Sequence, residues 1–382
     1  MNKATLNRDY TPENNLYLSL ELSNTIWHLG FSTGLGQNPR QRKMKAGDLD
    51  ELSFEIGQAK KRFGLPAETV VKSCYEAGRD GFWIHRALET IGVENQIVDS
   101  ASIEVNRRAK RAKTDNLDVV KLLSMLIRYH NGEQSVWRVV RVPTEEEEDE
   151  RHLHRQLLSL KTDRTRYINR LKSLLVTQGL RMGVGQHFLQ DLAKARRWDG
   201  SPIPPGLMAR LEQEYASLDF VQQQIRELEI ERRARLRHAD THALQQVRAL
   251  MKLRGIGINS AWLFVMEFFA WRQFRNRREI GALAGLTPTP YQSGDQAVER
   301  GISKSGNRYI RAMAIEIAWS WLRHQPDSEL STWFHQRYAE NGKRQRKIGI
   351  VAVARKLLIA MWRYLETGEI PAGAQMKSAV CV

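Results

Sequence analysis

The first part of the chain alternates strand-like and helix-like patterns of hydrophobic residues. Leucine occupies every second position from Leu16 to Leu22, which predicts a strand at 15–23 with a hairpin partner at 25–31. Alternating strands and helices are typical of an α/β layered domain, to which we assign residues 1–142. The other expected elements are strands at 69–75 and 96–98, helices at 48–62 and 81–91, and two helices divided near residue 112.

Residues 143–247 carry a purely helical pattern. Two stretches, 153–174 and 207–228, repeat apolar residues with the 4,3 spacing of a coiled coil. A connection rich in proline and glycine, at 183–206, separates them. We expect an antiparallel helical hairpin, or an arm through which the chain oligomerises. The six consecutive acids at 145–150 are typical of a helix N-terminus stabilised by its dipole, which we favour over a metal site.

Residues 248–374 predict a mainly α-helical domain with loops, and 375–382 a flexible tail. Between two helical patterns stand Arg254, Gly255 and Gly257. The glycines would let backbone N–H groups approach a phosphate, as in helix-hairpin-helix modules, so this turn is a candidate nucleic-acid contact. A tight packing turn accounts for the same residues equally well.

Positive charge is concentrated in this last part of the chain. The 382 residues carry 59 Lys and Arg against 43 Asp and Glu, a formal net charge of +16. Between Trp271 and Arg363 alone there are 17 Lys and Arg against 7 Asp and Glu, a net of +10. Such a concentration is typical of a polyanion partner, although a highly charged soluble surface would give the same count. Arginine dominates the set, which favours bidentate phosphate contacts.

Composition also excludes several classes of protein. No apolar run reaches the length of about 18 residues that a membrane span needs. The first residues lack the apolar segment of a secretory signal peptide. Only Cys74 and Cys381 are cysteines, which excludes a disulfide scaffold and a cysteine-based zinc site. We therefore expect a cytoplasmic protein without a membrane partner.

Four acidic residues of the first domain form a candidate metal site. Glu21 lies on the first expected strand, and Glu76 directly follows the strand at 69–75. Asp115 and Asp118 are three apart and so share one helix face, which could equally be a solvated face. Acids borne by strands and by a helix can converge at one edge of a sheet. Their hard oxygens suit Mg²⁺ or Mn²⁺, and two such ions can clamp the oxygens of a phosphodiester.

A candidate nucleophile lies in the last domain. Ser293 precedes a glycine, on a loop that nearby prolines keep out of a helix, although a plain turn serine has the same pattern. Its hydroxyl would need a base, a metal or cationic neighbours to become reactive. Four cations follow closely in the sequence: Arg300, Lys304, Arg308 and Arg311. They could hold a scissile phosphate, or serve as ordinary DNA-backbone or surface charge.

Two sets of residues together point to a family. The first is Glu76 followed by 113–118. The second, more specific set is an ordered series in the last domain: Leu253-Arg254-Gly255-Ile256-Gly257, Phe274, Leu283-Ala284-Gly285-Leu286-Thr287-Pro288, Ser293-Gly294, Ile302-Ser303-Lys304-Ser305-Gly306-Asn307 and Arg311. With these residues the chain resembles the DEDD transposases of the insertion-sequence one-ten family, which include Piv-type invertases, and its eleven-eleven subgroup in particular.

The resemblance implies a fold and a chemistry. It implies a RuvC-like, RNase H-like α/β first domain, a helical coiled-coil linker and a mainly α-helical C-terminal transposase domain. It implies a DNA recombinase that moves a mobile element, in which Ser293 attacks the DNA phosphodiester and forms a covalent phosphoserine. Ser303 or Ser305 would take this role in a shifted alignment. The acids that would bind Mg²⁺ or Mn²⁺ are Glu21, Glu76, Asp115 and Asp118.

The resemblance also implies partners and a location. These are donor and target DNA, a non-coding bridge RNA that pairs with both, and further copies of the chain in a dimer or tetramer. The protein would be prokaryotic and nucleoid-associated. The candidate nucleic-acid contacts are then Arg254, Gly255, Gly257, Arg300, Lys304, Asn307, Arg308 and Arg311.

One position departs from the family pattern: either the site adjusts to it, or activity is weakened, or Glu21 is a displaced equivalent. The family usually has aspartate where this chain has Glu21, and the extra methylene would move the carboxylate oxygens by roughly 1 Å, which matters for the near-ideal octahedron that Mg²⁺ demands. Two alternatives to the transposase also stay open. One is a RuvC-like nuclease that hydrolyses branched DNA with water. The other is a nucleic-acid-binding protein whose catalytic site has decayed.

Overall fold

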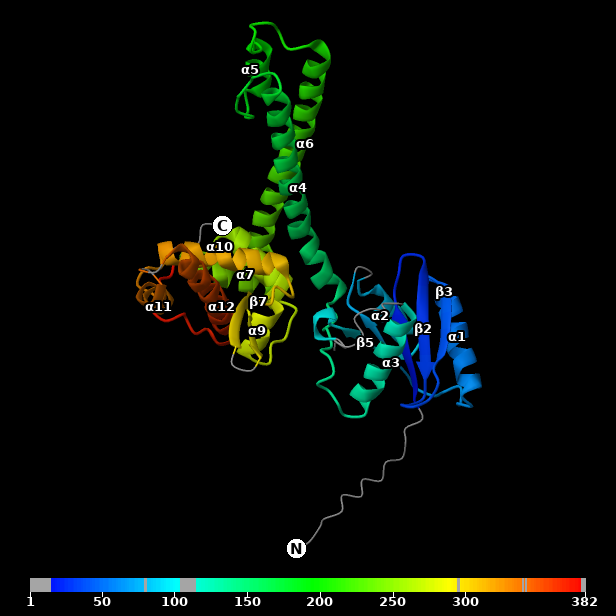
Figure 1. Cartoon of the computed structure of the whole chain (residues 1–382). Helices are drawn as coiled ribbons and strands as arrows, with labels where there is room; N and C mark the ends of the chain where they lie inside the picture. Colours follow the sequence, from blue (N-terminus) through cyan, green and yellow to red (C-terminus); the bar gives the residue numbers. More distant parts are fainter. Residues whose placement is uncertain are drawn as a thin grey trace. The chain divides into compact units, whose positions relative to one another are not determined.

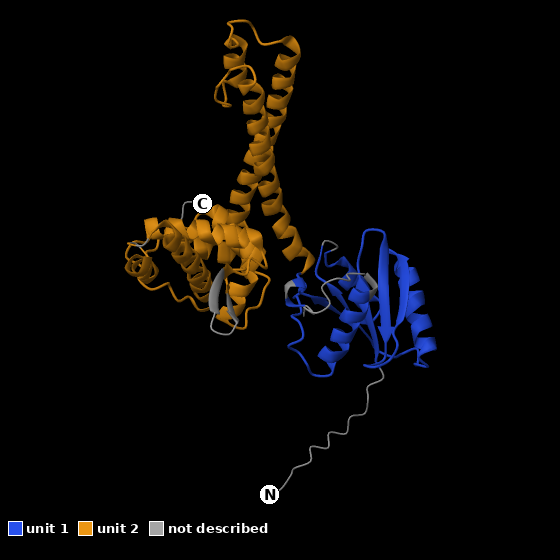
Figure 2. Ribbon diagram, viewed as in Figure 1, with its two compact units in different colours: residues 1–143 blue, residues 144–382 orange. Residues whose placement is uncertain are grey.

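The protein consists of two compact units, residues 1–143 and 144–382 (Figure 2). The first expected domain ends one residue before this division, and the second and third expected domains both fall in unit 2. The computed structural model describes six stretches of the chain: 15–78, 81–103, 115–293, 296–338, 340 and 342–378.

Unit 1 is built on a five-stranded sheet with the order β3-β2-β1-β4-β5 (Figure 1). The pairs β3-β2 and β2-β1 are antiparallel, whereas β4 and β5 run parallel to β1. The strands are β1 at Leu16–Glu21, β2 at Ile26–Ser32, β3 at Arg40–Lys45, β4 at Val71–Glu76 and β5 at Val93–Val98.

Helices cover both faces of this sheet. The leucines of β1 pack with α1 (Leu49–Arg62) and α2 (Trp83–Thr90), because alternate residues of a strand point to opposite faces. The other face, which includes Tyr17, packs against α3 (Asp115–His130). The α/β layers expected from the sequence are therefore confirmed.

Unit 1 differs from the expectations at two strands, and one expected helix lies outside the described residues. The strand β3 was not expected, because its residues are polar apart from Met44; its position is fixed by pairing with β2. The strand expected at 96–98 begins earlier, at Val93. After the short helix η1 (Ser100–Ser102), the helix expected before residue 112 falls on 104–114, outside the described residues.

A long helical arm begins unit 2. Helices α4 (Glu145–Val176) and α6 (Pro205–His238) lie antiparallel, with α5 (Phe188–Lys194) at the far end of the arm (Figure 1). The expected helical hairpin is confirmed, and its leucines form the buried seam. Thr144 caps α4 in a capping box with Glu147, so the run of acids does begin a helix.

The rest of unit 2 is mainly helical and packs around the largest hydrophobic core of the described chain. A two-stranded sheet interrupts the helices and was not expected from the sequence. No helix of the described stretches is both long and apolar enough to cross a membrane. The elements are α7 (His242–Lys252), α8 (Ile258–Phe264), η2 (Val265–Phe269), α9 (Arg277–Leu283), β6 (Pro288–Ser293), β7 (Gln296–Ile302), α10 (Arg308–His324), α11 (Glu329–Tyr338) and α12 (Lys343–Thr367).

Candidate functional site

The strand ends of unit 1 bring two candidate acids to one edge of the sheet. Glu21 is the last residue of β1 and Glu76 the last residue of β4. These strands are parallel neighbours, and Leu20 pairs with Tyr75. Glu21 and Glu76 each follow this pair by one residue, so they lie side by side on the two strands. This edge also carries the end of β5, where Val98 pairs with Glu76.

Helix α3 begins near the same end of the sheet and carries further acids. The Ser19 hydroxyl donates a hydrogen bond of 2.8 Å to the carbonyl oxygen of Val119. Residues two apart on a strand share a face, so Glu21 lies on the face that α3 covers. Asp118 directly precedes Val119, and the helix begins at Asp115. The structure therefore brings the ends of β1 and β4 and the start of α3 together, and we call Glu21, Glu76 and Asp118 the carboxylate edge.

The carboxylate edge is open to solvent. Glu76 is exposed, and Glu21 and Asp118 are half-buried. The side chain of Asp115 lies outside the described part of the chain. Among the described residues, no three His, Cys, Asp or Glu side chains are close enough together to hold a metal ion.

In unit 2, Ser293 lies on a strand and not on the expected loop. It is the last residue of β6 and pairs with Gln296 of β7, next to the hairpin turn. Pro288 and Pro290 exclude a helix, as expected, but a two-stranded sheet has only edge strands, in which proline is tolerated. The turn residues 294–295, and the side chains of Ser293 and Arg300, are outside the described residues.

Two family segments, 283–287 and 303–307, pack against each other through their backbones; we call them the glycine clasp. Three hydrogen bonds join them: Ser303 N–H to Thr287 O at 2.8 Å, Lys304 N–H to Gly285 O at 3.2 Å, and Asn307 N–H to Leu283 O at 3.0 Å.

Glycine is required on both sides of the clasp. Gly285 has φ +67° and Gly306 has φ +85°, values that other residues adopt at a cost. A Cβ atom would lie 2.0 Å from the Ser305 carbonyl oxygen at the first position and 2.1 Å from the Leu283 carbonyl oxygen at the second. The glycines of this motif therefore serve close packing.

Several expected nucleic-acid contacts have partners in the same region. The Asn307 side chain caps α10 by accepting from Tyr309 N–H at 2.9 Å. Arg311 donates to the Ala284 carbonyl oxygen at 3.4 Å. The exposed Arg308 lies over the Tyr309 ring, 4.8 Å from its centroid. Lys304 is exposed and has the positive φ of 56°.

The two alternative nucleophiles belong to a chain of hydroxyl groups. Thr287 donates to the Ser303 Oγ at 3.3 Å, and Ser305 donates to the same oxygen at 3.1 Å. Ser303 is half-buried and Ser305 is exposed. Their hydroxyls therefore bond to one another within the clasp.

The turn at Arg254 is hydrogen-bonded to the end of α10 and to the C-terminal segment. The carbonyl oxygen of Arg254 accepts from Gln325 at 3.0 Å, that of Gly255 from Ser320 at 2.9 Å, and that of Ile256 from Lys377 at 2.7 Å. These contacts support the packing-turn alternative.

The same segment also changes the expectation of a flexible tail. Arg254 N–H donates to the Gln375 carbonyl oxygen at 3.2 Å, and Met376 pairs with Leu253. Residues 375–377 are thus bound to the turn, while 379–382 fall outside the described residues.

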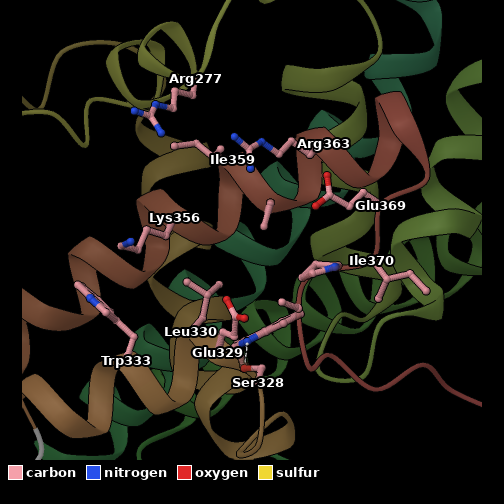
Figure 3. A pocket seen from close by; sticks show the side chains of 14 residues that line it. Arg277, Ser328, Glu329, Leu330, Trp333, Lys356, Ile359, Arg363, Glu369 and Ile370 are labelled. Atoms are coloured by element: carbon pink, nitrogen blue, oxygen red, sulfur yellow. Dashed lines mark hydrogen bonds between the residues drawn. The ribbon is translucent and has the colours of Figure 1, made fainter.

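A cavity of about 390 Å³ in unit 2 was not anticipated from the sequence (Figure 3). Three cations, Arg277, Lys356 and Arg363, line it together with apolar side chains. One signal was available: Lys356 and Arg363 are seven residues apart on α12, which places them on one face of a helix.

Several known proteins are similar in sequence to this chain, one of them over nearly its whole length. A model of the transposase family IS116/IS110/IS902 matches residues 247–332. The protein named "Putative transposase y4rJ" from Sinorhizobium fredii is 40% identical over 380 residues, which cover 95% of each chain. The transposase for insertion sequence element IS1111A from Coxiella burnetii is 25% identical over 303 residues, 78% of each chain. The transposase for IS1328 from Yersinia enterocolitica is 24% identical over 229 residues, 59% of this chain and 66% of that relative. The chain therefore belongs to the IS116/IS110/IS902 family of insertion-sequence transposases.

Proposed function

We propose that this transposase cuts and rejoins DNA through a covalent phosphoserine intermediate, with divalent metal held by the acids of unit 1. The observation that carries the proposal is the carboxylate edge, where two neighbouring strand ends and the start of a helix carry acidic residues at one end of the sheet. We further propose that unit 1 is RNase H-like. The order β3-β2-β1-β4-β5, with an antiparallel hairpin followed by two parallel strands, supports this assignment.

The donor set fits Mg²⁺ or Mn²⁺. The edge presents carboxylate oxygens, the ligands that these hard cations prefer, and offers no thiolate or imidazole among the candidates. When bound, such a metal neutralises charge on a phosphodiester and lowers the cost of expelling an alkoxide.

The covalent step conserves phosphodiester bonds. The Ser293 Oγ attacks phosphorus, a P–O bond to one deoxyribose oxygen breaks, and the proton lost by the serine ends on the leaving hydroxyl. A hydroxyl of another strand reverses the step, so strands are exchanged without hydrolysis. Exposed cations that follow Ser293, such as Arg308, would stabilise the charge that develops on the phosphate.

We also propose that a bridge RNA guides the choice of DNA and that the arm joins further copies of the chain. The local charge of +10 between Trp271 and Arg363 supports binding of more than one nucleic-acid strand. The arm supports oligomerisation because Phe220 and Ile230 of α6 are large apolar residues with 61% and 63% of their surface exposed.

The decisive experiment is a search for a protein–DNA adduct. Wild-type protein is incubated with the non-coding RNA of the element, its DNA ends and Mg²⁺, then denatured and run on a gel. We expect an adduct that Ser293→Ala abolishes, whereas Ser303→Ala and Ser305→Ala retain it. An adduct that survives Ser293→Ala would refute the assigned nucleophile.

The same assay separates the two alternatives. A RuvC-like nuclease would cut DNA in an acid-dependent reaction in which Ser293→Ala is nearly harmless. A decayed site would leave salt-sensitive binding without any cleavage. Glu21→Asp adds a second test: a gain of activity would identify Glu21 as a handicap, and a loss would identify an edge adapted to glutamate.

A further inference from the structure

The cavity between α11, α12 and residues 369–372 has the features of a nucleotide site (Figure 3). We propose that it binds one unpaired nucleotide of a nucleic-acid strand, with the base inside and the flanking phosphates on the cations at its mouth. This inference rests on the proposed function, because that function makes nucleic acid the partner of unit 2.

The size and walls of the cavity suit a single base. Its volume of about 390 Å³ lies within the range of about 300–1,000 Å³ typical of small-ligand sites and is too small for a base pair with its backbone. Leu330, Ile359 and Ile370 give it apolar walls (Figure 3). A planar base removed from water would gain from these contacts, since every base has an apolar face.

One of the cations at the cavity lies over an aromatic ring. The Lys356 Nζ lies 4.7 Å from the centroid of the Trp333 ring. An aromatic ring attracts an ammonium group but carries no net charge. It therefore does not neutralise the ammonium group, whereas a carboxylate would. Figure 3 shows the Ile359 side chain between those of Arg277 and Arg363. A phosphate between such groups would relieve their mutual repulsion and accept paired hydrogen bonds.

Two carboxylates in the lining favour a nucleotide over a simple anion as the ligand. Glu329 and Glu369 border the same cavity and would repel an acidic peptide. A carboxylate can accept a hydrogen bond from the exocyclic amine of a base, as glutamate does with cytosine. The site should therefore favour cytosine over uracil or thymine, because those two bases present a carbonyl oxygen at the same place.

Binding of short labelled oligonucleotides to the full chain tests the inference. The probes are ten-residue single strands of cytosine or of uracil as RNA, of cytosine or thymine as DNA, and a DNA duplex. We expect Lys356→Ala with Arg363→Ala to weaken binding of cytosine strands about tenfold or more and to reduce its salt dependence. The matched control, Arg344→Ala with Arg346→Ala, removes two exposed cations of α12 that do not line the cavity.

A cavity-filling variant separates shape from charge. Ala360 lines the cavity, so Ala360→Phe would fill it and leave every charge in place. We expect it to remove the preference for cytosine. Strands carrying 5-iodocytosine should crosslink on irradiation to a peptide that contains Trp333. The RNA and DNA probes decide which strand is the natural occupant.

Three results would overturn the inference: equal losses in the cavity and control variants, crosslinks confined to other segments, or duplex binding that depends equally on Lys356 and Arg363. If Ala360→Phe fails to fold, the charge variants and the crosslink still decide.

The adduct assay on the same protein separates failure of the cavity inference from failure of the proposed function. Normal adducts with unaffected strand binding would reject the cavity alone, whereas cavity-dependent binding without an adduct would reject the chemistry alone.

Discussion

The carboxylate edge of unit 1 and the glycine clasp of unit 2 both contain residues of the family pattern, but they use them differently. At the edge, Glu76 ends a strand and is exposed, so the sheet is complete without its side chain. In the clasp, Gly285 and Gly306 are in contact with backbone atoms of the opposite segment. A motif residue can therefore be required for packing or available for chemistry, and the two cases predict opposite effects of substitution.

The largest effect is expected in the clasp. Gly306→Ala places a Cβ atom 2.1 Å from the Leu283 carbonyl oxygen at a φ of +85°. Strain and overpacking together should destabilise unit 2 by about 4 kcal/mol. Hydrogen exchange of unit 2 peptides during chemical denaturation would measure this loss.

Gly301 offers a matched control for the clasp. It has the same φ of +85°, but nothing lies within 4 Å of the position its Cβ atom would occupy. Gly301→Ala should therefore cost only the conformational strain, about 1 kcal/mol. Equal costs at the two positions would show that close approach of the segments is not what selects glycine.

The second effect concerns His154, which lies buried at the base of the arm. Burial lowers its pKa to about 4, with Glu267 opposing the shift and Arg232 and Arg155 adding to it. The folded pKa is below the unfolded value of 6.5, so the unfolded chain binds more protons between these values. Stability present above pH 6.5 should fall by about 3 kcal/mol as the pH drops toward 4.

The pH dependence can be assigned with one exposed histidine as control. His154→Gln should flatten the stability of unit 2 between pH 4 and 6.5. His152→Gln changes an exposed residue of the same helix and should leave the slope intact. A slope that persists without His154 would place the titrating group elsewhere.

The third effect tests the edge. Glu76→Gln removes a charge that the sheet does not need, so unfolding should be unchanged while adduct formation falls about 100-fold or more. That loss corresponds to about 2.7 kcal/mol in the barrier. Glu94→Gln is the control, because Glu94 is an exposed glutamate near the opposite end of β5. Loss of stability in Glu76→Gln would mean that the edge is structural, like the clasp.

The same contrast explains what could be predicted from the sequence. The leucine alternation from Leu16 indicated β1 because its pattern is local, whereas β3 has almost no apolar residues and depends on pairing with β2. The sequence was enough to identify the acids at the strand ends as candidates. That β1 and β4 are neighbours, which puts these acids at one edge of the sheet, follows from the strand order. The clasp depends on two segments meeting across about 20 residues of sequence, which no local pattern encodes. The position of Ser293 next to a hairpin turn likewise depends on the pairing of β6 with β7, which no local pattern encodes.

The smallest effect on stability is expected from an ion pair on the arm, which is neither part of the hydrophobic core nor part of the candidate site. Arg170 on α4 donates to Glu214 on α6 at 2.8 Å, and the arginine side chain is 47% exposed. Solvent screening should limit the coupling between the two residues to about 0.5 kcal/mol, although the geometry is good. A double-mutant cycle with Arg170→Ala and Glu214→Ala, followed by thermal unfolding, measures this coupling. A coupling several times larger would mean that the arm, like the clasp, depends on a few specific contacts and not on its leucine seam.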